Sequence, residues 1–301
     1  MTVNAAIEQF LIDQRVRGNS PETIKYYTHC LGKFSLYCGD DFDVTYISLF
    51  LCKEYYLHLS NLDLNTVSIQ SYIRGLRSFL HYLYEEAYIT EDICSKFKLP
   101  KASRKIIDVL SDDEISMLLA ALSGNEWLTV RNRLIVALML DSGLRLNEVV
   151  TLQASSVHLK ERYLIVTGKG DKQRTVPFGE FTAATLEEYL SITKNIGPRT
   201  TLIIKVSETH CGFEPITQAT IKNMFRRLKA RSGISRLYPH LLRHTFATRY
   251  LENGGNIYTL QAILGHSSLE MVKKYLHLAS SRIRADFPRF SPLDNIKKDP
   301  S

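Results

Sequence analysis

The residues with the clearest chemical potential lie in the segment His240-Leu-Leu-Arg243-His244. His240 and Arg243 are three positions apart, so they share one face of a helix that would begin at Pro239. Backbone N–H groups at a helix N-terminus attract anions, and the two side chains add donors there. His240 and His244 also have the spacing of a zinc pair, but Leu241 stands where a metalloprotease has Glu, and no third ligand lies nearby. The segment favours an anion site; we expect no metal and no cofactor, and a structural role for His244.

Further residues could join such a site, although each alone has an ordinary structural explanation. Arg145 and Glu148 lie three apart at the start of a short expected helix, where the carboxylate can orient the guanidinium. Taken alone, they would be a surface ion pair of little energetic weight. Lys169 lies between two glycines at the tip of an expected hairpin, where its ammonium group can reach outward. His266 follows a helix-ending glycine and Tyr275 lies on the next expected helix, so a cap and a packing residue are the alternative interpretations.

The first hundred residues are expected to form helices. Ser20 precedes Pro21, which is the pattern of an N-cap and a first helical residue, and the helix should run to about residue 37. Apolar residues repeat at helical spacing from Thr66 to Tyr88. We expect a small helical bundle whose aromatic side chains, among them Tyr72, Phe79, Tyr82 and Tyr84, pack in its core and on its surface rather than stack on bases.

The second part combines helices with one small sheet. Ser111 and Glu114 form a capping box at the start of a helix that reaches about residue 122. Two short β-like runs, Tyr163–Thr167 and Arg174–Pro177, should pair as a hairpin. Further helices are expected at 130–140, 181–193, 217–232, 239–252 and 257–264, and after Ser267. The predicted fold class is mainly α with a small antiparallel β-sheet in the second domain (α+β).

A basic segment separates the two parts. We expect a helical domain over residues 1–97, a linker over 98–107, and a second domain over 108–301 with a tail from about 280. Pro100 interrupts any continuous helix through the linker. Four cations lie within eight residues there, and they fit either a solvated connector or a strap across phosphates: Lys98, Lys101, Arg104 and Lys105.

The net positive charge of the chain comes from its second part. Residues 1–104 have a formal net charge of −1 and residues 105–301 one of +8, within a total of +7. An excess of this kind favours a polyanionic partner. Part of it lies on one expected helix, residues 216–233, which carries Lys222, Arg226, Arg227 and Lys229.

Composition excludes several classes of protein. The 301 residues are 45% hydrophobic and 23% charged, which is typical of a globular chain and not of a disordered one. The longest apolar run, Leu134–Leu140, is too short to cross a membrane, and the N-terminus lacks the pattern of a secretory signal. Five cysteines without CxxC spacing indicate reduced thiols. We therefore expect a cytoplasmic protein that is not a membrane protein.

Together, these motifs resemble the tyrosine recombinase (phage integrase) family in order and approximate spacing. The motifs are Gly143-Leu-Arg145-Leu-Asn-Glu148, Lys169, His240-Leu-Leu-Arg243-His244, Leu264-Gly-His266 and Tyr275. The resemblance covers residues 108–280, and the first part looks like the SAM-like core-binding domain of that family. Within the family the chain is similar to Xer-type recombinases and to compact integrases of mobile elements.

The resemblance implies a site-specific DNA recombinase that cleaves and rejoins strands through a 3′-phosphotyrosyl intermediate, in integration, excision or dimer resolution. It implies that Tyr275 is the nucleophile, that Lys169 protonates the leaving 5′-oxygen and that His240 handles the tyrosine proton. The phosphate would be held by Arg145, Arg243 and His266, with Glu148 in support.

The implied partner is double-stranded DNA with specific recombination sites, contacted in part by the basic residues of 98–105 and 222–229. The resemblance also implies a homo-oligomer, a tetramer on two sites linked by the tail, and leaves an accessory DNA-bending protein open. Two alternatives remain: DNA relaxation of the type IB topoisomerase kind, and a non-catalytic DNA-binding regulator.

Overall fold

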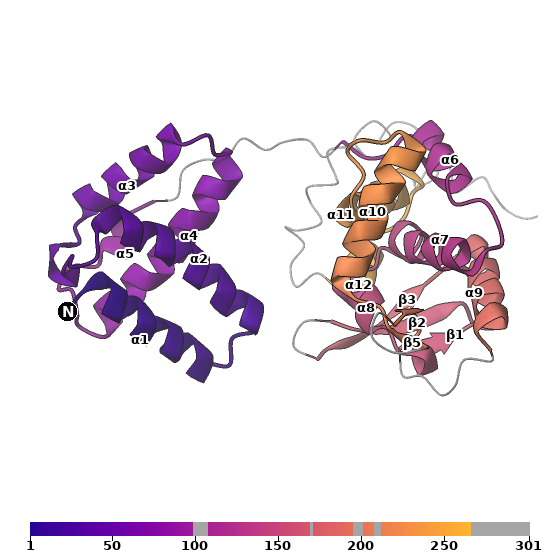
Figure 1. The fold of residues 1–301 in the computed structure, drawn as a ribbon, viewed down its shortest axis with the longest axis horizontal. Helices are drawn as coiled ribbons and strands as arrows, with labels where there is room; N and C mark the ends of the chain where they lie inside the picture. Colours follow the sequence, from indigo (N-terminus) through magenta and orange to yellow (C-terminus); the bar gives the residue numbers. More distant parts are fainter. Residues whose placement is uncertain (99–107, 169–170, 195–200, 208–211, 266–301) are drawn as a thin grey trace, which may run out of the picture. The chain divides into compact units, whose positions relative to one another are not determined.

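A computed structural model of the chain describes residues 1–98, 108–168, 171–194, 201–207 and 212–265. The chain divides into two compact units, Met1–Ile106 and Ile107–Ser301, which we call the first and the second unit (Figure 1). No helix in the described ranges combines the length and the apolar character that a membrane crossing requires.

The first unit is a bundle of helices, as the sequence predicts. Ser20 accepts a hydrogen bond from the backbone N–H of Thr23 and caps the second helix, which begins at Pro21. Helix α2 packs against α1 and α4, and α3 and α5 also contact α4. The helices are α1 (Val3–Val16), α2 (Pro21–Cys38), α3 (Leu49–Asn61), α4 (Thr66–Glu85) and α5 (Ile93–Lys96), with a 3-10 turn η1 (Val44–Tyr46).

Aromatic rings fill the core of the first unit. Phe10 lies at the centre, with edge-to-face contacts to Tyr27, Phe79 and Tyr82 at centroid distances of 5.0–5.7 Å. Edge-to-face geometry is favourable between aromatic rings because the positive edge of one meets the negative face of the other. Of the four aromatic residues expected in the core or on the surface of α4, Tyr72, Phe79 and Tyr82 are buried and Tyr84 is exposed.

The second unit has seven described helices and two small sheets. Ser111 and Glu114 form the predicted capping box at the start of its first helix. The helices are α6 (Asp112–Ala120), α7 (Trp127–Leu140), α8 (Leu146–Thr151), α9 (Glu180–Thr193), α10 (Gln218–Ser232), α11 (Pro239–Glu252) and α12 (Ile257–Leu264), with a 3-10 turn η2 (Ala154–Ser156). The apolar helix α7 lies at the centre, between α9 and α11.

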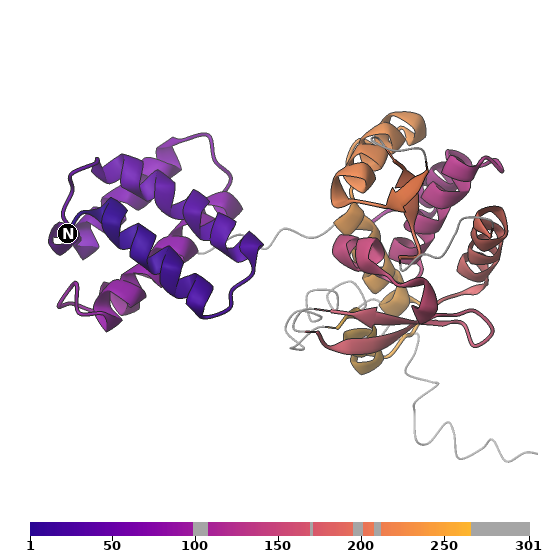
Figure 2. The same ribbon diagram turned by 60° about the horizontal axis from the view of Figure 1, so that its bottom comes forward.

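The predicted hairpin is present and gains a third strand. Strands β1 (Val157–His158), β2 (Tyr163–Thr167) and β3 (Gln173–Pro177) form an antiparallel sheet in the order β1-β2-β3 (Figure 2). Val166 pairs with Arg174 and Leu164 with Val176. Because side chains alternate along a strand, Arg174 points to the same face as the buried Val176.

A second sheet was not expected. Strands β4 (Ile204–Val206) and β5 (Phe213–Pro215) pair as an antiparallel ribbon. The prediction of a single sheet misses it because three-residue strands carry too few alternations to stand out in a sequence. The second sheet leaves the predicted class unchanged, since both sheets are small and antiparallel.

Candidate active site

A turn after helix α7 places Arg145 at the start of α8. Gly143 has a left-handed φ of 66°, and a Cβ there would lie 2.4 Å from Cδ1 of Phe246, so only glycine fits this turn. Glu148, three residues on, accepts from the backbone N–H of Arg145 at 2.8 Å and from its Nη1 at 2.8 Å. The carboxylate therefore fixes both the helix start and the guanidinium, as the i, i+3 spacing predicts.

Helix α11 brings Arg243 to the same place. Its side chain is 4% exposed, and its Nη1 donates to the carbonyl of Gly143 at 2.5 Å and its Nη2 to that of Leu264 at 2.7 Å. Arg243 Nη1 also lies 3.9 Å from Oε2 of Glu148. Arg243 lies 100 positions after Gly143 in the chain, and it joins the turn before Arg145 to the end of helix α12.

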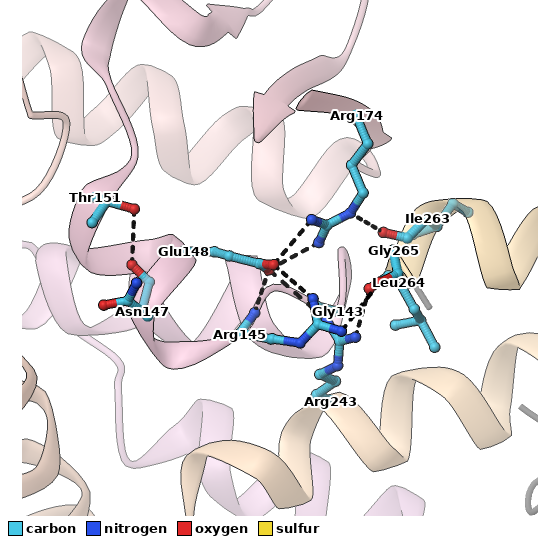
Figure 3. Close-up of polar contacts among 10 residues, drawn as sticks. All are labelled: Gly143, Arg145, Asn147, Glu148, Thr151, Arg174, Arg243, Ile263, Leu264 and Gly265. Atoms are coloured by element: carbon cyan, nitrogen blue, oxygen red, sulfur yellow. Dashed lines mark hydrogen bonds and ion pairs between the residues drawn. The ribbon is translucent and has the colours of Figure 1, made fainter. Parts of the chain in front are cut away.

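A third arginine, whose role the motifs in the sequence do not indicate, completes the group. Arg174 of β3 donates from Nη1 and Nη2 to the two carboxylate oxygens of Glu148, both at 2.9 Å (Figure 3). Glu148 lies between Arg174 on one side and Arg145 and Arg243 on the other. We call these four residues the arginine–glutamate cluster. The signal in the sequence was a cation on the inward face of a predicted strand, two positions before Val176.

The cluster keeps Glu148 ionised although it is buried. Burial by itself raises the pKa of this carboxyl, but hydrogen bonds from Arg174 and Arg145 outweigh that effect and leave the pKa below its usual range. Three guanidinium groups and one carboxylate give the cluster a net charge of +2. Arg145 is the most accessible of the three arginines, with a side chain 32% exposed. A partly open site of this charge suits a phosphate diester.

Three of the predicted catalytic residues, Lys169, His266 and Tyr275, lie outside the described residues. Two of their neighbours do lie at the cluster. A Cβ on Gly168 would be 3.4 Å from Nη1 of Arg174, and the carbonyl of Gly265 accepts from Nη2 of Arg145 at 3.5 Å.

The two histidines of α11 lie on the helix that carries Arg243. His240 is exposed in the first turn, three residues before Arg243, and His244 is half-buried. In the described part of the chain, no three His, Cys, Asp or Glu side chains are grouped so that they could hold a metal ion.

The basic helix α10 lies next to this site. It packs against α6 and α8, and Gln218 in its first turn donates to Asn147 of α8 at 3.0 Å. Lys222, Arg226 and Arg227 are exposed and Lys229 is half-buried. In the basic linker, Lys98 is exposed, whereas Lys101, Arg104 and Lys105 lie outside the described residues.

Comparison with known proteins finds matches along most of the chain. The phage integrase family matches residues 108–282, and the phage integrase SAM-like domain matches residues 2–99. The tyrosine recombinase XerD of Staphylococcus aureus is 31% identical over 295 residues, which is 95% of this chain and 98% of that protein. XerD of Halalkalibacterium halodurans is 29% identical over 300 residues, covering 97% and 99% of the two chains.

Solved structures share the fold. The Tn1549 transposon integrase in complex with a circular intermediate DNA is 20% identical, with a TM-score of 0.76 over 97% of this chain and 100% of that one. Both family matches and the full-length relatives point the same way, and the chain belongs to the phage integrase family of tyrosine recombinases, enzymes that cleave and rejoin DNA.

Proposed function

We propose that the second unit uses Tyr275 to exchange DNA strands at specific sites through a 3′-phosphotyrosyl intermediate. The observation that carries the proposal is the arginine–glutamate cluster: residues from α8, β3 and α11 converge with a net charge of +2. The positions before Lys169 and His266 lie at the same cluster. A phosphate bound to Arg145 would therefore be within reach of both segments.

The reaction conserves the energy of the phosphodiester bond. The Tyr275 oxygen attacks the phosphorus, a bond from that oxygen to phosphorus forms, and the bond to the 5′-oxygen breaks. Lys169 gives the leaving 5′-oxygen its proton. In the second step, the 5′-hydroxyl of another strand gives up its proton and attacks the phosphorus, the bond from phosphorus to the Tyr275 oxygen breaks, and that oxygen takes up a proton. No external energy source is needed, since each step exchanges one phosphate ester for another.

The main difficulty of this chemistry is that tyrosine is a weak acid, and we expect the cluster to help overcome it. With an ordinary pKa of about 10, only about one tyrosine in a thousand is ionised at pH 7, which costs about 4 kcal/mol. His240 takes the tyrosine proton in the attack. Arg145 and Arg243 bind the nonbridging oxygens, where negative charge grows in the transition state, and His266 adds a hydrogen bond. Glu148 supports the reaction by fixing the Arg145 guanidinium at 2.8 Å.

We propose that the basic residues of α10 and of the linker bind the DNA backbone. Lys222, Arg226 and Arg227 are exposed on a helix that contacts α8, so a duplex whose phosphate reaches Arg145 would pass close to them. The linker cations Lys98, Lys101, Arg104 and Lys105 would add phosphate contacts. Each such contact releases counterions and makes binding more sensitive to salt.

The proposed assembly is a tetramer on two DNA sites. An apolar cavity of about 470 Å³ in the second unit offers a docking place, and its walls include Ile115, Leu119, Val136, Leu140 and Phe246. We propose that it receives apolar residues from the tail of a neighbouring copy, which carries Ile283, Phe287, Phe290 and Leu293. Truncation after residue 280 should abolish joining of two sites while single-site binding persists; cooperative joining by the truncated chain would contradict this.

The chain's relatives and composition support a proposal for its biological context. One similar protein is a transposon integrase in complex with a circular intermediate DNA, and two others are XerD recombinases. We propose a role in integration and excision or in dimer resolution, with a cytoplasmic location because the cysteines are expected to be reduced. Sequencing the DNA retained by the Tyr275→Phe protein would distinguish the two roles.

A nicked suicide substrate tests the proposed chemistry. The nick lets the 5′-end diffuse away after cleavage, so the wild-type chain should accumulate as a covalent adduct. Tyr275→Phe should bind the same DNA and form no adduct. An adduct formed by Tyr275→Phe would refute the nucleophile. Failure of the wild-type chain to form any adduct on its own site would instead favour a non-catalytic regulator.

A further inference from the structure

Arg174 is bound to the protein through each nitrogen of its guanidinium group. Nη1 and Nη2 donate to the two oxygens of Glu148 at 2.9 Å, and Nε donates to the carbonyl of Ile263 at 2.6 Å (Figure 3). The side chain is 12% exposed, compared with 32% for Arg145. Exposure alone does not assign a role, since Arg243 is only 4% exposed. The role of Arg174 follows from its contacts, because its three nitrogens hold Glu148 and Ile263, whereas Arg145 is more open to a ligand.

The contacts of Arg174 join three segments that carry proposed catalytic residues. The first is its own hairpin, where a Cβ on Gly168 would lie 3.4 Å from its Nη1; Lys169 follows Gly168. The second is the start of α8. The third is the end of α12, where Gly265 has a left-handed φ of 60° and a Cβ would lie 3.0 Å from Cδ of Arg174; His266 follows. One side chain therefore lies against all three segments.

The charge of Arg174 also matters to its neighbours. A carboxylate has two oxygens with about four lone-pair sites. Each oxygen of Glu148 accepts one hydrogen bond from Arg174. Each also accepts one from Arg145, Oε2 from its backbone N–H and Oε1 from its Nη1. Without Arg174, the buried carboxylate would be compensated by Arg145 and Arg243 alone. Their charges would then be drawn to Glu148 and away from a phosphate.

We propose that Arg174 is a positioning residue for strand cleavage. Through Glu148 it holds the Arg145 guanidinium in the geometry that binds the scissile phosphate, and it leaves the charges of Arg145 and Arg243 available to the transition state. This inference rests on the proposed function, because it takes the cluster to be the phosphate site. It predicts a defect in the chemical step with little change in DNA affinity.

The test compares single-turnover cleavage of a nicked substrate by the full-length wild-type chain and by Arg174→Lys. Lysine keeps the charge but lacks the planar fork with which Arg174 binds both oxygens of Glu148 and the carbonyl of Ile263. A small displacement at a reacting centre can cost about 100-fold in rate, so we expect cleavage at saturating protein to fall by between tenfold and about 100-fold. The dissociation constant for the same DNA should change by no more than about twofold.

Arg133→Lys is a matched control for a loss of stability alone. Arg133 is also a partly buried arginine, 14% exposed, that pairs with a carboxylate, Glu188, and with the carbonyls of Leu122 and Gly124. Both variants should lower the melting temperature, but only Arg174→Lys should slow cleavage. Equal cleavage rates in the two variants would overturn the proposal.

A double-mutant cycle shows whether Arg174 acts through Glu148. The cleavage loss caused by Arg174→Lys is measured again in a Glu148→Gln background. If Arg174 acts through that carboxylate, the second loss should be at least several-fold smaller, since interacting residues are not additive. The same loss in both backgrounds would overturn the proposed route.

Tyr275→Phe in the same assay separates this inference from the function on which it rests. A persistent adduct there would refute the nucleophile, while the ratio of the Arg174→Lys rate to the wild-type rate would still test the positioning role. Normal cleavage by Arg174→Lys, with no adduct from Tyr275→Phe, would refute only the positioning role.

Discussion

The two units stabilise their interiors in different ways. Among the described residues, the buried polar side chains of the first unit are Gln14 and Ser35, and its core is built from aromatic and aliphatic groups. The second unit buries three charged side chains, Arg131, Glu148 and Arg243. Burying charge costs free energy that apolar packing would not, and a buried pair is weak evidence for stability. Two of these three side chains, Glu148 and Arg243, belong to the arginine–glutamate cluster.

The thiols and phenols of the first unit illustrate the contrast. Burial raises the pKa of Cys38 to about 11 and that of Cys52 to about 12, and it raises the pKa of Tyr55 still further. These groups remain neutral and act as packing residues. In the second unit, hydrogen bonds from arginines overcome the effect of burial and lower the pKa of Glu148.

The largest expected effect comes from Arg243. Arg243→Lys keeps a positive charge but loses the fork that binds Gly143 and Leu264. We expect single-turnover cleavage to fall by about 10²–10³-fold, which is typical of losing one donor to a transition-state oxyanion. The control is Arg236→Lys, a half-exposed arginine of the same unit that pairs with Glu114. A comparable loss in the control would break the distinction between the cluster and ordinary ion pairs.

Two glycine variants compare the units directly. A Cβ on Gly143 would lie 2.4 Å from Phe246, and one on Gly75 in α4 would lie 2.7 Å from Cβ of Cys30. Each alanine variant should lower the free energy of unfolding by roughly 1–3 kcal/mol, measured with urea. Only Gly143→Ala should also slow cleavage of bound DNA, because the carbonyl of Gly143 holds Arg243. Slower cleavage by folded Gly75→Ala would contradict the prediction that cleavage depends on Gly143 and not on Gly75.

A smaller effect is expected on the surface of α10. Lys222→Ala and Arg226→Ala should each reduce the slope of log affinity against log salt by about 0.9, since each removes one phosphate contact. Titrations of labelled DNA at several salt concentrations measure this slope. Lys222→Arg retains the charge and should retain the slope. An unchanged slope in both alanine variants would place the DNA backbone elsewhere.

The smallest effect is a dependence of stability on pH. Because the folded pKa of Glu148 lies below its ordinary value of 4.5, its contribution is fully present above about pH 4.5 and is lost as the pH falls through the folded value. Thermal melts between about pH 6 and about pH 3 should therefore show a steeper loss for the wild-type chain than for Glu148→Gln. Parallel curves would show that Glu148 is not held ionised by the cluster.

The sequence predicted the elements that depend on local signals. Ser20 and Ser111 cap helices where their positions before Pro21 and Glu114 indicate, and the alternation in 163–177 gives the β2–β3 hairpin. The contact between Arg145 and Glu148 also follows from local spacing.

The role of Arg174 could not be predicted in the same way. Its partners lie 26 and 89 positions away, and no local period indicates that β3, α8 and α12 meet. The strand alternation places Arg174 on the buried face, but the carboxylate that compensates it is known only from the folded chain. Long-range approach, rather than propensity, determines the site.

The most direct test of the account is to identify the residue that becomes linked to DNA. The adduct from a nicked substrate is digested with nuclease and protease, and the modified peptide is sequenced by mass spectrometry. We predict a nucleotide attached through its 3′-phosphate to Tyr275, and a correspondingly slower appearance of this peptide in Arg243→Lys. A nucleotide attached to any other residue, or one attached through a 5′-phosphate, would contradict it.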